Sequence, residues 1–227
     1  MIANLVDVIA VVDGLTRYLS GKGMVFNEQG FPCLRAEDFL AEWPDLVVPY
    51  DHRGAAYVGA PERTVLCFYC ADRLIYPRLE NVLSDLPTYR PFMGVIGADV
   101  TVTSDMDLEW QAEIMLLNQL FTATLAVNGI KVIANLRCGG VESEAFLSSI
   151  PQGVMCASGF LGCQKVPSVS DLGYLAKVVR VLPSKLILYG KSDCVAERQL
   201  TENGISWRRY PHIRDKDFRE HTLMSKS

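Results

Sequence analysis

The sequence predicts an α/β fold made of a parallel strand–helix repeat, TIM-barrel-like, with a helical and irregular extension at the N-terminus. Three observations predict it. Short, almost continuously apolar runs recur along residues 64–210, as strands covered on both faces require. Helical patterns separate most successive runs, which indicates right-handed crossovers and a parallel sheet. No glycine-rich phosphate loop follows the first run, so a complete or incomplete barrel is favoured over an open doubly wound sheet.

The composition is that of an ordinary globular chain. Of its 227 residues, 49% are hydrophobic and 21% are charged, and this length suits one domain. The net charge of −4 argues against an all-over basic coat but leaves room for a local basic patch.

The chain is expected to be cytoplasmic. Its seven cysteines are an odd number, and several lie in apolar runs, which is typical of free thiols in a reducing compartment. Asp7 and Asp13 interrupt the apolar N-terminus, and no basic region precedes it. We therefore predict neither a secretion signal nor a membrane segment, and no membrane partner.

The first part of the chain, residues 1–62, is expected to form an N-terminal helix and a lid layer. Apolar residues recur at helical spacing over residues 1–20, and Gly21 and Gly23 would end that helix. Residues 21–62 are predicted to be irregular, with a short helical piece near 36–42. Residues 63–227 would form the catalytic or binding domain, and the two parts a single compact unit.

From residue 64 onward the pattern becomes regular and predicts six strands. The predicted strands are residues 64–70, 92–98, 130–136, 153–157, 185–189 and 205–210. The predicted helices between them are residues 76–86, 107–128, 143–149, 170–182 and 194–203.

Polar side chains gather where these predicted strands end. Ligands of parallel α/β folds bind beyond the carboxyl ends of the strands, so we expect the functional site there. The candidate catalytic residues are Asp72 and Asp99, which follow the first two predicted strands. The candidate substrate-binding residues are Asn135, Arg137, Glu142, Ser158, Gly159, Tyr189 and Lys191.

Each candidate also has a structural interpretation. Asp72 and Asp99 are equally suited to capping the N-termini of the helices that follow them. Asn135 could satisfy loop backbone groups, Arg137 could form a structural ion pair, and Tyr189 could be a core residue.

The sequence predicts no metal site and no cofactor. The thiols of Cys67 and Cys70 would face opposite sides of a strand, and no second pair or suitably spaced histidine completes a zinc site. His52, His212 and His221 lie outside the predicted core. A histidine-based triad would therefore require the chain ends to fold back over the strands.

Two carboxylates among hydrogen-bonding groups suit cleavage of a glycosidic bond. One carboxylate can stabilise a developing oxocarbenium ion while the other manages a proton or positions water. Asp72 and Asp99 are the residues available for these two roles. The same set of side chains could also bind a small polar ligand without chemistry.

The segment 207–214 interleaves aromatic and cationic side chains, a composition typical of surfaces that grip phosphates and stack bases. Its alternative interpretation is a solvated segment neutralised by the acidic residues that follow it. The candidate nucleic-acid-binding residues are Arg73, Arg78, Trp207, Arg208, Arg209, Tyr210 and Arg214.

The succession of motifs resembles a family catalogued as a domain of unknown function, common in phage and bacterial genomes. The matching pieces span roughly residues 60–195 and are Phe68-Tyr69-x-x-Asp72, Gly94-Val95-Ile96-x-x-Asp99, Gly129-Ile130-x-Val132-Ile133-x-Asn135, the strand at 153–159 and Leu188-Tyr189-Gly190. Two positions depart from the family pattern, since Ala98 replaces a proline and Cys138 replaces an aromatic residue. Both lie at the expected site, which indicates a ligand different from that of its relatives.

More distantly, the layout is similar to the barrel of tRNA-guanine transglycosylases, which act at an N-glycosidic bond of a nucleic acid. Together with the two carboxylates and the basic–aromatic segment, this resemblance favours a DNA glycosylase-like hydrolase or a transglycosylase, with DNA rather than RNA as the expected partner. The resemblance to the phage-linked family makes a modified phage base the expected substrate. Two alternatives remain open. One is a non-catalytic nucleic-acid-binding accessory protein, and the other is a small-molecule enzyme or binder that uses the same strand ends.

Overall fold

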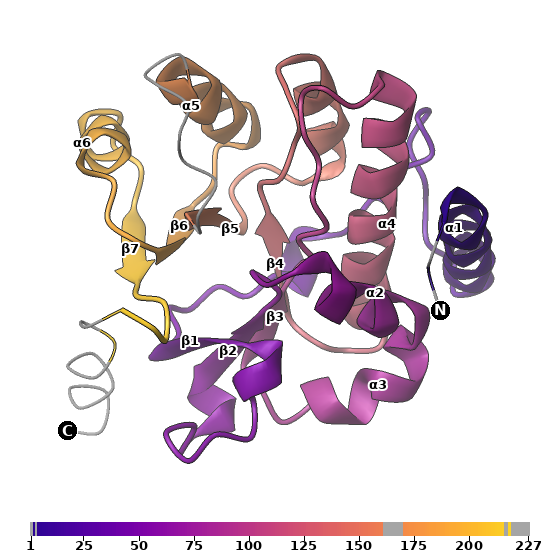
Figure 1. The fold of residues 1–227 in the computed structure, drawn as a ribbon, viewed down its shortest axis with the longest axis horizontal. Helices are drawn as coiled ribbons and strands as arrows, with labels where there is room; N and C mark the ends of the chain where they lie inside the picture. Colours follow the sequence, from indigo (N-terminus) through magenta and orange to yellow (C-terminus); the bar gives the residue numbers. More distant parts are fainter. Residues whose placement is uncertain (1, 3, 161–169, 216–217, 219–227) are drawn as a thin grey trace.

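The computed structural model describes residues 2, 4–160, 170–215 and 218, and its central feature is a parallel sheet that curls into a nearly closed barrel (Figure 1). Seven strands lie in chain order, each parallel to the next. They are β1 (Leu46–Pro49), β2 (Thr64–Cys67), β3 (Gly94–Ile96), β4 (Val132–Asn135), β5 (Met155–Phe160), β6 (Lys185–Gly190) and β7 (Trp207–Tyr210).

Helices surround the barrel. The α-helices are α1 (Leu5–Gly21), α2 (Asp72–Glu80), α3 (Val82–Tyr89), α4 (Leu108–Val127), α5 (Ser170–Val181) and α6 (Cys194–Glu202). The 3₁₀ helices are η1 (Ala36–Asp38), η2 (Tyr50–His52), η3 (Pro61–Arg63) and η4 (Glu142–Ser149). The predicted fold class is confirmed, namely an α/β, TIM-barrel-like fold whose barrel is incomplete.

Three elements of the structure differ from the prediction. The sequence analysis missed β1, because its four residues fall in a stretch rich in proline and glycine. The prediction of one helix over residues 76–86 is wrong, since Asn81 leaves the helical conformation and separates α2 from α3. The segment predicted as a helix over 143–149 is a 3₁₀ helix.

Side chains of the strands alternate between the barrel interior and the surrounding helices, as the two-residue period of a strand requires. In and just after β2, Val65, Cys67 and Tyr69 belong to the cluster that fills the interior. Their neighbours Leu66 and Phe68 belong to the larger cluster that contacts the helices. The interior is therefore a packed core rather than a channel.

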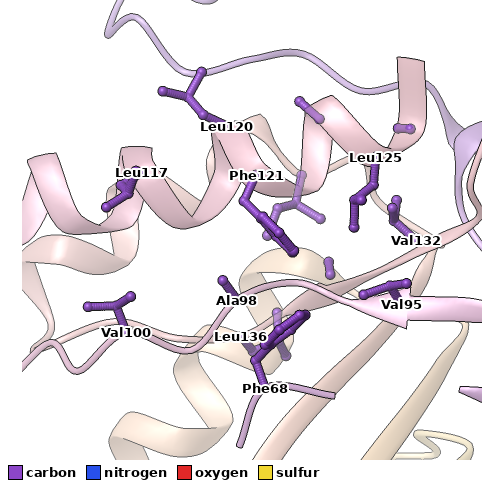
Figure 2. Packing of buried hydrophobic residues seen from close by; sticks show 14 of the residues in the cluster. Phe68, Val95, Ala98, Val100, Leu117, Leu120, Phe121, Leu125, Val132 and Leu136 are labelled. Carbon is purple, nitrogen blue, oxygen red and sulfur yellow. The ribbon is translucent and has the colours of Figure 1, made fainter. Parts of the chain in front are cut away.

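Helix α4 is buried almost all round, because the barrel covers one side and α1 packs on the other (Figure 1). Figure 2 shows Phe121 pointing from α4 toward Phe68. The two rings meet edge to face with centroids 5.1 Å apart, and Tyr89 packs against both. This contact joins the helix layer to the strands that carry the site.

The amino-terminal end of the barrel is covered by residues 36–43. Leu40 N donates a 2.9 Å hydrogen bond to the carbonyl of Val132 at the start of β4, and the Leu40 side chain joins the interior cluster. Part of the expected lid layer thus lies opposite the carboxyl ends of the strands.

One seam of the barrel stays open, since β1 and β7 form no ladder with each other in the described part of the chain. Side chains bridge it instead. The Tyr210 hydroxyl donates a 2.6 Å hydrogen bond to the carbonyl of Pro44, and the Arg208 guanidinium lies 4.8 Å from the ring centre of Trp43.

No helix in the described ranges is both long and apolar enough to cross a membrane.

We expect Phe121→Ala to lower the free energy of unfolding by about 3–5 kcal/mol, because it opens a cavity where three aromatic rings meet. Leu108→Ala, on the same helix but at a position 41% exposed, is the matched control, with an expected loss below about 1 kcal/mol. Urea unfolding followed by circular dichroism measures both. Equal losses for the two variants would contradict the packing described above.

Candidate active site

Asp99 lies just beyond β3 at the carboxyl end of the barrel, and Asn135 holds it there. The Asn135 Nδ2 atom donates to Asp99 Oδ1 at 2.8 Å and to the carbonyl of Ala98 at 3.0 Å. The Asn135 Oδ1 atom accepts from the Tyr69 hydroxyl at 3.1 Å. A continuous chain of hydrogen bonds therefore runs from Tyr69 through Asn135 to the carboxyl group of Asp99.

The backbone after Asp99 is fixed from the other side by α4. The buried side chain of Asn118 accepts a 3.2 Å hydrogen bond from the backbone nitrogen of Val100. A Cβ atom on Gly97 would lie 2.6 Å from the Thr122 hydroxyl, so only glycine allows this approach between β3 and α4. Both contacts determine where the Asp99 carboxyl group lies.

The Asp99 side chain is 18% exposed and lies beside two cations. Arg137 Nε is 4.0 Å from Asp99 Oδ1, and it has no hydrogen-bond partner within the described residues. Burial raises the pKa of Asp99, and this effect exceeds the opposing effects of Arg137, Asn135 and Lys177. The site thus holds a carboxyl group biased toward its protonated form and, beside it, a buried N–H group with no hydrogen-bond partner in the described part of the chain.

Asp72 lies at the same end of the barrel, as the first residue of α2. It accepts hydrogen bonds from the Thr101 backbone nitrogen at 3.2 Å and from the Thr101 hydroxyl at 3.0 Å. Its charge contributes to the raised pKa of Asp99. The structure therefore places the two predicted catalytic carboxylates at the same end of the barrel.

The alternative role of these aspartates as helix N-caps is not observed. Ala71 is the N-cap of α2, and Asp107 is the N-cap of α4, eight residues after Asp99. The two carboxylates are thus not accounted for by capping.

An aromatic wall borders the site. The rings of Tyr69 and Tyr189 stack with centroids 5.4 Å apart and an angle of 18° between their planes. A Cβ atom on Gly159 would lie 2.6 Å from the Tyr69 ring, so this glycine is what lets the ring lie against β5. His212 packs edge-on against Tyr189 at 5.8 Å, which shows that the chain folds back over the strand ends after β7.

Lys177 of α5 also reaches the site. Its Nζ atom donates a 3.0 Å hydrogen bond to the carbonyl of Leu136, at the end of β4. Cys138 and Glu144 both raise the pKa of Lys177, against the larger lowering effect of burial, and Glu144 is only 5% exposed. These side chains extend the site from Asp99 toward η4 and α5.

Four functional candidates were missed by sequence reasoning, namely Tyr69, Glu144, Lys177 and His212. The two-residue alternation from Val65 through Cys67 was a signal that Tyr69 points inward. Glu144 and Lys177 come from helices, where no strand-end rule applies. His212 lies two residues after β7, at a strand end, and the sequence analysis placed it outside the predicted core.

The remaining predicted substrate-binding residues lie at varied distances from this centre. Ser158 is buried within β5, and the alternation of the strand turns it away from the interior. Glu142 is exposed at the first position of η4, and Lys191 is exposed just after β6.

The predicted nucleic-acid-binding residues do not form one continuous face. Arg78 pairs with Asp85 at 2.8 Å, and Arg208 lies at the opposite end of the barrel beside Trp43.

The other members of this set are also dispersed. The indole of Trp207 donates to Thr201, Arg209 donates to the carbonyl of Gly190, and Tyr210 bridges the seam. Arg73 and Arg214 are exposed.

A small cavity adjoins the site. A cavity of about 30 Å³ lies between α4 and the ends of β3 and β4, and its volume admits water rather than a nucleobase.

Among the described residues, no group of three or more His, Cys, Asp or Glu side chains could hold a metal ion. Six cysteines are free thiols, and the seventh, Cys163, lies outside the described residues.

The fold and site together define an incomplete parallel α/β barrel with a carboxylate-centred polar site at its strand ends. A family model matches residues 25–210, from before β1 to the end of β7, and the chain belongs to that family, the domain of unknown function DUF4417. The expected membership of such a family is confirmed. No curated protein and no solved structure matches the chain.

Asp99 should make the stability of the protein depend on pH. Because its pKa is raised on folding, the folded state binds this proton more tightly than the unfolded chain does. Stability should therefore fall as the pH rises from about 4, the ordinary value of an aspartate, through the raised pKa.

Asp99→Asn removes this titration, so the free energy of unfolding of the variant, relative to the unaltered protein, should increase with pH over that window. Urea unfolding at a series of pH values measures the difference. A difference that is constant with pH would contradict the burial of Asp99.

Proposed function

We propose that this protein is an enzyme that cleaves the N-glycosidic bond of a nucleobase in nucleic acid, with DNA that carries a modified base as the favoured substrate. The observation that carries the proposal is the pairing of a buried carboxyl group, Asp99, with a second carboxylate, Asp72, at the same strand ends. Cleavage of a glycosidic bond needs two such groups with different proton affinities.

The two environments support a division of roles. The raised pKa of Asp99 suits a general acid that protonates the departing base, since the carboxyl group keeps its proton closer to neutral pH. Asp72 lies nearer the rim and accepts hydrogen bonds only from Thr101 in the described structure. It suits the stabilisation of an oxocarbenium ion or the orientation of water.

The neighbouring groups support the binding of an extruded base. The stacked rings of Tyr69 and Tyr189 are 4% and 0% exposed, so they form a rigid buried support next to Asp99. A base removed from the duplex stack is commonly held by hydrogen bonds to its edge, and a rigid support keeps the donors and acceptors for these bonds in place. The guanidinium group of Arg137, whose side chain is 25% exposed, supplies donors suited to that edge or to the sugar.

A second candidate function is an enzyme of the same chemistry that acts on a small nucleoside-like molecule. It is favoured by the dispersion of the basic residues, because Arg78 and Arg208 are engaged in contacts with Asp85 and Trp43. Nucleic-acid binding would then depend on a smaller set of exposed cations, which includes Arg73 and Arg214.

We expect the protein to release a base from one or more DNAs that carry modified bases, and Asp99→Asn and Asp72→Asn to lower the rate by about 100-fold or more. Chromatography of released bases and cleavage of the resulting abasic sites measure the reaction. Asp13→Asn, an exposed position on α1, should leave the rate unchanged. Base release that persists in both Asp99→Asn and Asp72→Asn would contradict the assignment of these carboxylates as catalytic.

The salt dependence of binding separates the two substrates. If the substrate is DNA, the logarithm of the binding constant should fall linearly with the logarithm of salt concentration. Arg73→Ala and Arg214→Ala should each reduce the slope by about one, if each cation contacts one phosphate. Fluorescence anisotropy with a labelled oligonucleotide measures the slope. A flat salt response together with turnover of free nucleosides would favour the second candidate.

A further inference from the structure

Lys177 is unusual among the described lysines in where it places its amine. It belongs to α5, in the helix layer, yet its Nζ atom reaches the carbonyl of Leu136 at the carboxyl end of β4. The residue that follows Leu136 in the chain is Arg137, whose Nε atom lies 4.0 Å from Asp99 Oδ1. The amine therefore lies on the same side of the site as Asp99, the carboxyl group whose pKa is raised.

Two other lysines provide a comparison. Lys131 and Lys185 also donate hydrogen bonds to backbone carbonyls, those of Glu37 and Ala41. Both bonds lie at the amino-terminal end of the barrel and are exposed. A hydrogen bond to a carbonyl is thus a common structural use of lysine in this protein, but of these three described lysines it is Lys177 whose amine lies at the carboxyl end of the barrel, where Asp99 also lies.

The surroundings of Lys177 favour a nucleophilic amine. Burial is the main cause that lowers the pKa of Lys177, and the charge of Arg137 lowers it further, against the opposing effects of Cys138, Asp99 and Glu144. A larger fraction of the amine is then neutral, and a neutral amine can attack a carbonyl carbon. Asp99, whose carboxyl group is biased toward its protonated form, can supply the proton that this reaction consumes.

We propose that Lys177 forms an imine with the aldehyde of an open-chain sugar, with Asp99 as the proton donor. The proposal rests on the proposed function, because removal of a base from deoxyribose leaves a sugar whose C1′ opens to an aldehyde. The same aldehyde chemistry has two sources, an abasic site within DNA and a free deoxyribose phosphate.

The imine forms in two steps, through a carbinolamine. The lone pair of Lys177 Nζ forms the bond to C1′ as the C1′–O π bond breaks, and the amine proton passes to that oxygen to give a carbinolamine. The Asp99 carboxyl group then protonates the hydroxyl, which leaves as water, and the nitrogen lone pair forms the C=N bond. The products are a protonated imine, one water molecule and the Asp99 carboxylate.

Reductive trapping tests the proposal directly. The full-length protein is incubated with borohydride and either an oligonucleotide that contains a preformed abasic site or 2-deoxyribose 5-phosphate. Hydride reduces the imine to a stable secondary amine, so intact-mass spectrometry should show one covalent adduct. The source that gives the adduct at the lower concentration identifies the natural partner. Proteolysis and peptide mass spectrometry should map the adduct to residue 177.

Lys177→Arg keeps the positive charge and a donor for the Leu136 carbonyl but cannot form the imine, so adduct formation should fall at least tenfold. Lys185→Arg is the matched control and should trap as the unaltered protein does. Circular dichroism compares the folding of both variants. Mapping of the covalent adduct in the unaltered protein tests the role of Lys177 even if Lys177→Arg is poorly folded.

The proposal is overturned by an adduct that maps to another amine, by wild-type trapping in Lys177→Arg, or by no adduct from either aldehyde. Because the abasic site is preformed, trapping does not require base removal. An adduct at Lys177 without base release from any modified DNA would keep this inference and reject the proposed function. Base release without an adduct would do the reverse.

Discussion

The burial of α4 between the barrel and α1 is the constraint on which the site depends. A helix packed on both sides cannot shift without the loss of many apolar contacts, so it is a rigid support for what touches it. Asn118 uses that support to hold the backbone beside Asp99, and Thr122 sets how closely β3 approaches. The Asp99 carboxyl group is therefore positioned by the core rather than by a loop.

The same rigidity explains how the protein tolerates a costly site. Asp99, Arg137 and Lys177 lie together with little exposure to water, and burial shifts the pKa of both Asp99 and Lys177 toward the uncharged forms. Such an arrangement opposes folding, and it persists only because the surrounding packing compensates for it. Functional sites are the usual places where a fold carries this kind of cost.

Sequence reasoning recovered the fold and the strand-end placement of Asp99, Asn135 and Arg137 because both follow from the strand pattern. Asp99, Asn135 and Arg137 come directly after apolar runs, and parallel strands bring such positions to one edge. The pattern did not contain β1, whose four residues end in a proline, nor the division between α2 and α3 at Asn81. Lys177 reaches the site only through tertiary packing, which no local periodicity encodes.

The open seam has a consequence for self-association. β1 and β7 each have one edge that pairs with no other strand in the described part of the chain, and such edges invite strands from other molecules to add to the sheet. Here each edge strand has only four residues, β1 ends in a proline, and β7 carries adjacent arginines at positions 208 and 209. Short length, a missing donor and like charge all oppose intermolecular strand addition, so the barrel can remain unclosed without becoming a template for aggregation.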